Sequence, residues 1–242
     1  MKFIFTCLLL TTSTLLIAQE KLVVNYQFNY AYDTSVSKDP KRLAIFKESN
    51  QNTGEYLLIT TKEEATFKTI EKLNNTQSIS DVESIPVPNR NDYIDFKNHY
   101  SLVQMDFNGK LFLIKDSITT YQWIIQRDKD QFLGYEVRKA IAKRDNVTYE
   151  AWYAPNLPFK AGPDITFGLP GVILKLTIIL DQDDGMHQHI YTATKVELND
   201  KAKIIKPTKG ELMMVDDFVV YFNEIFRIEA ELENNKVDRK ID

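Results

Sequence analysis

Alternation of apolar and polar residues is the clearest pattern near the beginning of the chain. From Leu22 to Tyr32 every second residue is apolar, and this set includes Tyr26, Phe28 and Tyr30. Side chains of a strand point to opposite faces with a period of two, so the segment is expected to be a half-buried strand with an aromatic inner face. The three rings either line an apolar concavity or belong to an ordinary core, as aromatic stripes usually do.

Short strand-like segments separated by polar turns follow along most of the chain. The turns include Asn108-Gly109, a pair that tolerates the positive backbone angles of tight hairpins. The expected strands are residues 43–46 and 56–60, which form a hairpin, and residues 99–104, 109–114, 121–125, 135–142, 149–153, 171–180 and 190–198.

Two segments have a helical period. Thr61 is placed to cap a short helix over residues 62–73. Near the C-terminus, apolar residues recur at helical spacing from Phe218 to Leu232, which predicts an amphipathic helix that covers a sheet face. Together the elements predict a mainly β (α+β) fold: a strongly curved antiparallel sheet, similar to the half barrel of lipoprotein carriers, with a few packed helices including a C-terminal one.

The first residues have the pattern of a signal peptide. Lys2 precedes an apolar run that ends near Ala18, and this run is shorter than the ~20 residues of a transmembrane helix. We therefore expect residues 1–18 to be removed, which leaves residues 19–242 as a single domain in the periplasm or at the periplasmic face of the outer membrane. Cys7 lies inside the expected signal peptide, so neither a disulfide nor a lipid anchor is expected in the mature chain.

A set of glycine, proline and aromatic motifs stands out in the second half of the chain. It comprises Gly134-Tyr135-Glu136, then Trp152-Tyr153-Ala154-Pro155, and finally Gly168-Leu169-Pro170-Gly171-Val172-Ile173. This set resembles the GLPGLI family of Bacteroidetes envelope proteins, with Val172 in place of the leucine of the family name. The resemblance implies an exported protein of unknown function. Asp116-Ser117-Ile118 also resembles the O-glycosylation acceptor of this bacterial group, although Asp-Ser is by itself a common turn.

The glycine-proline motif has a structural interpretation and a functional one. Pro170-Gly171 favours a type II turn that leads into a buried strand, because proline restricts one backbone angle and glycine permits a positive one. In the structural interpretation the turn sets the strand register. In the functional one, Trp152, Tyr153, Gly168, Leu169, Pro170 and Gly171 form a ligand or partner surface.

Candidates for chemistry are sparse. His187 and His189 lie two residues apart, so they share one face of a strand, and with Asp183 they form a candidate zinc or copper site; the alternative is a solvated hairpin tip. The chain has no Gly-x-Ser-x-Gly elbow and no phosphate-binding glycine loop. No cofactor is expected, and we do not expect an enzyme.

The function expected from these features is binding. The formal net charge of −4 and the interspersed charges argue against nucleic acid as a partner. We expect a non-enzymatic protein that binds a hydrophobic ligand, such as a lipid or lipoprotein, or an envelope protein such as an outer-membrane transporter or assembly protein. The alternative is a metal-binding protein or a hydrolase whose site is assembled only in the fold.

Overall fold

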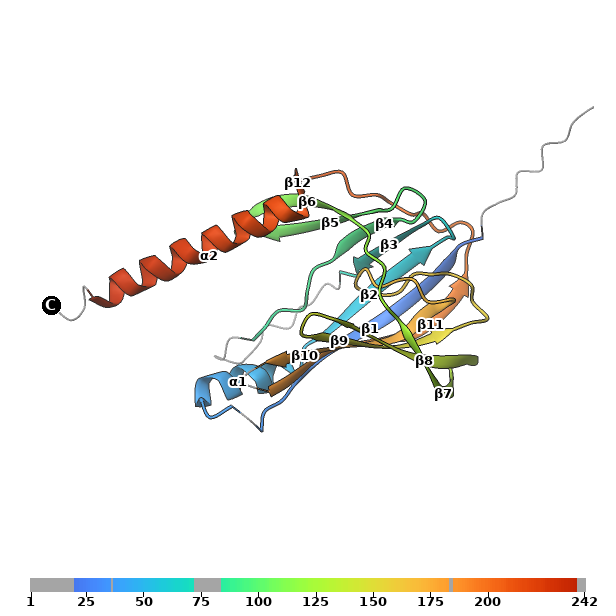
Figure 1. The fold of residues 1–242 in the computed structure, drawn as a ribbon, viewed down its shortest axis with the longest axis horizontal. Helices are drawn as coiled ribbons and strands as arrows, with labels where there is room; N and C mark the ends of the chain where they lie inside the picture. Colours follow the sequence, from blue (N-terminus) through green and yellow to red (C-terminus); the bar gives the residue numbers. More distant parts are fainter. Residues whose placement is uncertain (1–19, 36, 72–83, 183–184, 239–242) are drawn as a thin grey trace, which may run out of the picture.

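The computed structural model describes residues 20–35, 37–71, 84–182 and 185–238, which form one large sheet and two helices (Figure 1). The expected signal peptide lies outside the described residues. In chain order the elements are β1 (Leu22–Tyr32), α1 (Pro40–Ser49), β2 (Thr53–Thr60), β3 (Glu64–Thr69), β4 (Asn91–Asp95), β5 (Tyr100–Phe107), β6 (Lys110–Ser117), β7 (Ile124–Phe132), β8 (Tyr135–Arg144), β9 (Val147–Ala154), β10 (Val172–Gln182), β11 (Gly185–Leu198), β12 (Glu211–Met214) and α2 (Val215–Asp238).

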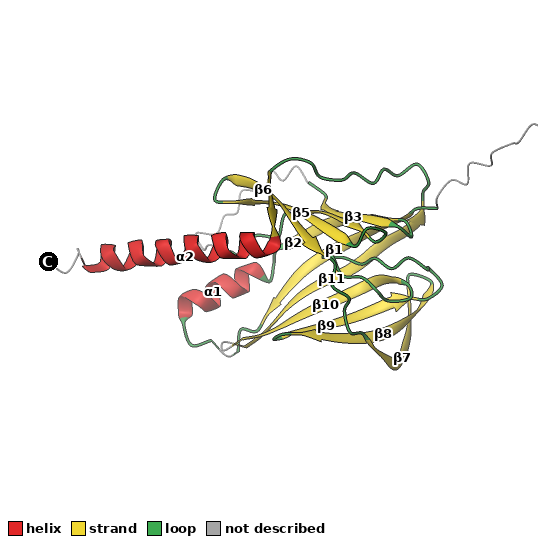
Figure 2. Cartoon of the chain, turned by 45° about the horizontal axis from the view of Figure 1, so that its top comes forward, coloured by secondary structure: helices red, strands yellow, loops and turns green. Residues whose placement is uncertain are grey.

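The described strands form a single 12-stranded sheet in the order β12-β6-β5-β4-β3-β2-β1-β11-β10-β9-β8-β7. Neighbouring strands are antiparallel, except that β12 runs parallel to β6. The sheet is strongly curved and open, because its two edges, β12 and β7, do not pair with each other (Figures 1 and 2). The expected mainly antiparallel, curved sheet with a few helices is therefore confirmed.

The core lies on the concave face of the sheet, which is here called the inner face. β1 supplies its centre: Tyr26, Phe28 and Tyr30 are each at most 4% exposed. Phe28 has ring neighbours on both sides, with its centroid 6.0 Å from that of Tyr56 on β2 and 4.8 Å from that of Tyr191 on β11. The aromatic face of β1 thus joins the two halves of the sheet.

The expected hairpin strand at residues 43–46 is wrong, because these residues belong to α1. The side chain of Asp39 accepts a hydrogen bond from the backbone N–H of Lys41 at 2.9 Å, and Pro40 occupies the first helical turn, where its missing N–H costs nothing. Phe46 stacks on Tyr32 with centroids 4.9 Å apart, which fixes the helix against the end of β1.

The expected helix over residues 62–73 is also wrong where the chain is described, because Glu64–Thr69 forms β3. Thr61 does accept hydrogen bonds from the backbone N–H groups of Glu63 and Glu64, but these close a tight turn between β2 and β3. Ala65 and Phe67 are two residues apart and both belong to the core, which is the period of a strand and not of a helix.

The expected C-terminal helix is present as α2, but it packs over an end of the sheet. Phe218 is 7% exposed and lies against Phe112 of β6, and Phe107 of β5 contacts Phe222. Beyond these contacts the helix extends away from the sheet (Figures 1 and 2). Among the described residues, no helix combines the length and apolar character needed to cross a membrane.

The segment between β11 and β12, residues 199–210, forms a strap across the outer face of the sheet. Lys21 donates hydrogen bonds to the carbonyl oxygens of Asp200 and Ala202 at one end of the strap. At the other end, the side-chain amide of Gln104 donates a 2.7 Å hydrogen bond to the carbonyl oxygen of Lys209. The strap is thereby held at both ends.

Replacing Phe28 by alanine should destabilise the protein by about 3–5 kcal/mol, because the substitution leaves a cavity at the centre of the aromatic core. Urea unfolding followed by circular dichroism measures this loss. The matched control is Ile124→Ala, a residue that is 67% exposed, for which we expect a change within about 0.5 kcal/mol. Similar losses for both variants would contradict the central position of Phe28.

Candidate functional site

The turn formed by Gly168, Leu169, Pro170 and Gly171 lies at the end of the long loop between β9 and β10, residues 155–171. Leu169 is 1% exposed and belongs to the core, whereas Gly168 and Pro170 face solvent. Of the other two residues in the expected partner surface, Tyr153 is buried and Trp152 is half-buried. The turn therefore presents two outward residues and no exposed apolar patch at Leu169.

The expected type II turn at Pro170-Gly171 is wrong, because the positive φ belongs to Gly168, at +98°. Gly171 is needed for a different reason. A Cβ atom at this position would lie 2.1 Å from the carbonyl oxygen of Ala154 on β9. Absence of a side chain lets the first residues of β10 approach the end of β9.

Two aromatic residues of the segment before β7, Tyr121 and Trp123, pack beside this turn. The indole N–H of Trp123 donates a 2.9 Å hydrogen bond to the carbonyl oxygen of Phe167. Tyr121 stacks on Trp123 with ring centroids 5.4 Å apart and meets Tyr149 of β9 edge to face. Residues before β7 thus hold the loop against the sheet.

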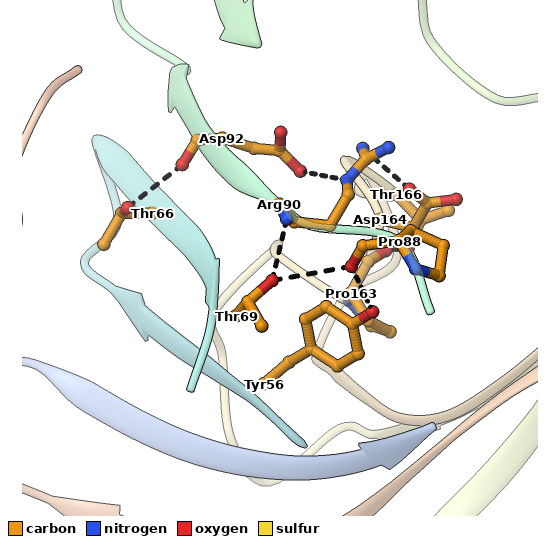
Figure 3. A network of polar contacts seen from close by, with 9 residues as sticks. All are labelled: Tyr56, Thr66, Thr69, Pro88, Arg90, Asp92, Pro163, Asp164 and Thr166. Atoms are coloured by element: carbon orange, nitrogen blue, oxygen red, sulfur yellow. Dashed lines mark hydrogen bonds and ion pairs between the residues drawn. The ribbon is translucent and has the colours of Figure 1, made fainter. Parts of the chain in front are cut away.

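Arg90, Asp92 and Asp164 form an ion-pair network between this loop and the other half of the sheet (Figure 3). Arg90 Nε lies 2.8 Å from Asp92 Oδ2, and Arg90 Nη2 lies 2.7 Å from Asp164 Oδ1. The hydroxyl oxygen of Thr69 accepts a 2.7 Å hydrogen bond from the backbone N–H of Arg90 and so helps to position this residue. One guanidinium therefore joins β4 to the loop that carries the turn.

The two carboxylates of this network differ in their surroundings. The side chain of Asp92 is 1% exposed, and its Oδ1 has no hydrogen-bond partner among the described residues, whereas Asp164 is 24% exposed. Burial raises the pKa of Asp92 to about 6, although Arg90 acts in the opposite direction. Burial also disfavours the charge of Arg90, but Asp164 and Asp92 outweigh this effect and raise the pKa of its guanidinium.

The loop next to this network has a strained backbone. Asp164 and Ile165 have φ angles of +53° and +57°, a left-handed conformation that is a genuine outlier for a β-branched residue. Such positions cost roughly 1–3 kcal/mol each and persist only where their surroundings enforce them. The ion pair to Arg90 and the 3.1 Å hydrogen bond from the backbone N–H of Thr166 to the carbonyl oxygen of Pro163 supply this constraint.

A cavity of about 200 Å³ adjoins the strained loop. Its lining includes Asp164, Tyr121, Arg144, Asp116 and Ser117. Asp92 does not reach it, since that side chain is buried.

The network of Arg90, Asp92 and Asp164 therefore acts as an electrostatic clamp that holds the loop on β4. One of its carboxyl groups, that of Asp92, is buried and can change its protonation state.

The expected metal ligands lie at the other end of the core. His187 is 2% exposed and packs against Phe46, so it is no part of a solvated hairpin tip, and His189 contacts Tyr30. Burial lowers the pKa of His189. Asp183 lies outside the described residues, and the residues that are described contain no group of three His, Cys, Asp or Glu side chains placed to hold a metal. The metal site stays a prediction.

The expected apolar concavity is filled by its own side chains. Tyr26, Phe28 and Tyr30 pack among other rings of the core, and the hydroxyl of Tyr26 donates a hydrogen bond to the carbonyl oxygen of Ile173 on β10. These three residues form the ordinary core that was the alternative interpretation.

Exposed apolar residues gather instead on α2. Val219 and Phe226 are 49% and 50% exposed, and half-buried Phe222 lies between them at helical spacing. These three residues are here called the helix stripe. The contact of Phe226 with Phe222, at 4.6 Å between centroids, continues the stripe along the helix, and the ring of Phe226 lies 6.3 Å from that of Phe107 at the edge of the sheet contact.

Sequence reasoning missed Arg90, Asp92 and Trp123 as members of a site. Arg90 and Asp92 follow a proline-containing connection, and their partner Asp164 is far away in the sequence. The available signals were weak. Arg90 and Asp92 lie beside buried residues of β4, and Trp123 precedes the first motif of the family resemblance, which begins at Gly134.

Comparison with known families agrees with a protein of unknown function. A family model described as "Protein of unknown function (Porph_ging)" matches residues 113–175, from β6 to the beginning of β10. The matched segment includes Asp164 and the turn at residues 168–171. It covers less than half of the chain, so the resemblance to the GLPGLI family stays a prediction. No curated protein matches the chain.

Among solved structures, PNGF-II is similar in two crystal forms. The P21 form aligns with a TM-score of 0.54 and 18% identity over 86% of this chain and 33% of that chain. The C2 form aligns with a TM-score of 0.51 and 18% identity over 81% of this chain and 31% of that chain. This chain thus spans about a third of the length of PNGF-II, and the similarity shows the fold alone.

A putative outer membrane lipoprotein-sorting protein domain from Vibrio parahaemolyticus also aligns, with a TM-score of 0.29 and 9% identity over 77% of this chain and 88% of that chain. A similarity of this degree carries no argument about function.

Asp92→Asn should remove a pH dependence of stability. The carboxyl group has a higher pKa in the folded state than its ordinary value of 3.8, so the wild-type free energy of unfolding should fall as the pH rises from about 4 to about 6. The asparagine variant should lack this decrease. Urea unfolding at a series of pH values measures the difference, and an unchanged slope in Asp92→Asn would contradict the assignment.

Gly171→Ala should destabilise the protein more than Gly134→Ala. The first substitution places a methyl group against the carbonyl oxygen of Ala154, whereas the second strains only a positive φ of +83° in open space and should cost about 1 kcal/mol. Thermal unfolding of the two variants compares these effects. Equal shifts would show that the close approach of β10 to β9 can relax.

Proposed function

We propose that the protein is a non-enzymatic envelope protein that binds a protein partner through the helix stripe. The observation that carries this proposal is the exposure of Val219 and Phe226 on α2, although the ring of Phe226 still reaches Phe107 of β5 at 6.3 Å between centroids. Apolar residues that follow one side of a helix normally face a core or another protein. Helix-in-groove recognition uses the same spacing of apolar anchors.

The hydrophobic-ligand alternative has less support. A lipid-binding protein needs an apolar cavity, and the rings of Tyr26, Phe28 and Tyr30 occupy the concave face themselves. The partner proposal needs no such cavity. It also fits the expected export of the chain. An exported protein would meet outer-membrane transporters and assembly proteins, and we propose that the partner is one of these.

α2 also supplies a matched control position. Val220 is 70% exposed, yet it lies off the helix stripe, four residues from both Asp216 and Glu224. A glutamate at Val220 adds one negative charge to the same helix, against two in the double variant described next, and leaves the stripe intact.

The double variant Val219→Glu with Phe226→Glu should lose the partner, because two charges would have to be buried in an apolar interface. The measurement is affinity purification of the tagged protein from its native envelope, followed by mass spectrometry. Val220→Glu should retain the partner. Urea unfolding of both variants checks that they keep the fold. The double variant should lose more stability than Val220→Glu, because it also removes the ring contacts of Phe226 with Phe222 and Phe107.

Recovery of the same partner with the double variant would contradict the helix stripe as the binding surface. Recovery of a lipid without any protein from the wild type would contradict the proposal and support the hydrophobic-ligand alternative.

A further inference from the structure

The outer face of the sheet carries a cavity of about 680 Å³ beside the strap. This volume lies within the range of small-molecule sites, roughly 300–1,000 Å³. Strands β1 to β5 form its floor, Lys203 and Ile205 of the strap form one wall, and Ile70, Glu71 and Asn89 form another. The cavity is on the opposite face of the sheet from the aromatic core and from α2.

A single cross-strand row of residues makes up the floor. Strand pairing places Asn25 opposite Leu57, Leu57 opposite Lys68, and Lys68 opposite Asn91. The row continues to Gln104, whose side-chain oxygen accepts a 2.7 Å hydrogen bond from the amide of Asn91. With strands ~4.8 Å apart, this row extends for about 19 Å across the sheet.

The neighbouring row on the same face is buried and apolar except for Thr66, which lies between Ile59 and Tyr93. Val23 pairs with Ile59, and Tyr93 pairs with Leu102, and all four residues are buried. Ile204 of the strap packs against Tyr93 and Leu102. The strap therefore covers part of this buried row and leaves the row from Asn25 to Gln104 open beside it. The open row is polar except for Leu57 and is here called the polar row.

The chemistry of the polar row suits a hydrogen-bonding anion. Side-chain amides offer both donors and acceptors, and Asn25, Asn91 and Gln104 place three of them along the floor. One N–H of Asn91 is bonded to Gln104 and one N–H of Gln104 to the carbonyl oxygen of Lys209, so each of these two amides has one further N–H for a ligand. Among the charged lining residues, Lys68, Arg90 and Lys203 are cationic and Glu71 is anionic. The guanidinium of Arg90 is engaged with Asp92 and Asp164, which leaves the two lysines, one from the sheet and one from the strap, as donors to a ligand.

We propose that this cavity is a binding site for a small organic anion, in which Lys68 and Lys203 hold a phosphate or carboxylate group and the row of amides binds hydroxyl groups on the rest of the molecule. A polar cavity of this size remains hydrated when empty, and an anion that donates and accepts hydrogen bonds replaces that water without leaving buried polar groups unpaired. Two cationic donors, Lys68 on the floor and Lys203 on the wall formed by the strap, also select for a charged end over a neutral one.

The test uses the whole mature protein and glycerol 3-phosphate, which combines a phosphate with hydroxyl groups. Titration followed by ¹⁵N-¹H correlation spectra should shift the side-chain amide resonances of Asn25, Asn91 and Gln104 in a saturable way. Glycerol at the same concentrations should leave them unchanged. Lys68→Met should weaken binding about tenfold or more, because it removes a charge-assisted hydrogen bond.

Lys175→Met is the matched control, because Lys175 is an exposed lysine of β10 outside the cavity lining. This variant should bind glycerol 3-phosphate as the wild type does. Amide shifts that never saturate, or equal affinities for Lys68→Met and Lys175→Met, would overturn the proposal. Main-chain resonances of both variants report whether they keep the fold.

A second arm identifies the source of the anion. Sedimentation with phosphatidylglycerol vesicles, if abolished by Lys68→Met and kept by Lys175→Met, supports a lipid headgroup at the same site. Binding of glycerol 3-phosphate without vesicle binding supports a free anion. Because the helix stripe lies on another element, loss of partner binding through α2 would leave either result unaffected.

Discussion

Burial of the aromatic face of β1 is the interaction on which the rest of the structure depends. β1 pairs with β2 on one side and β11 on the other, so it is the only described strand that joins the N-terminal half of the sheet to the C-terminal half. Its inner residues contact rings from both halves, and Tyr26 is hydrogen-bonded to β10. The clamp, the turn at residues 168–171 and the strap all hold positions that this central strand establishes.

Much of the strand content could be predicted because period-two alternation is a local property of the sequence. β1, β5, β6 and β8 to β11 follow from it directly. The strand expected at residues 121–125 is largely wrong, because residues 121–123 precede β7 (Ile124–Phe132), whose mostly polar and exposed sequence has little alternation. The errors at residues 43–46 and 62–73 share a cause: both segments are short, and too few apolar residues are present to distinguish a strand from a helix. Asp39 and Pro40 are local signals that could have indicated α1. In contrast, β3 is a strand because Phe67 pairs opposite Leu58 of β2, and this pairing exists only in the folded sheet.

The clamp could not be predicted because its members meet only in the folded sheet. Nothing near Asp164 in the sequence indicates Arg90 as its partner. Gly171 was expected to be required for a positive backbone angle, and this expectation was wrong. Its backbone angle is ordinary, and the absence of a Cβ atom beside Ala154 is what the position requires. The polar row on the outer face is likewise a product of register, since its five residues come from five strands.

The position of β1 also affects how the chain reaches its native state. Leu22 pairs with Leu198, so β1 finds one of its two neighbours only after the long segment between these residues has been synthesised. Closing so long a loop is entropically expensive, and proteins dominated by distant contacts fold slowly. Until β11 arrives, one edge of β1 and its aromatic residues stay open to solvent and to other chains. An incompletely folded molecule of this topology is therefore prone to aggregation, and association of this chain with a chaperone before folding would protect its most apolar strand.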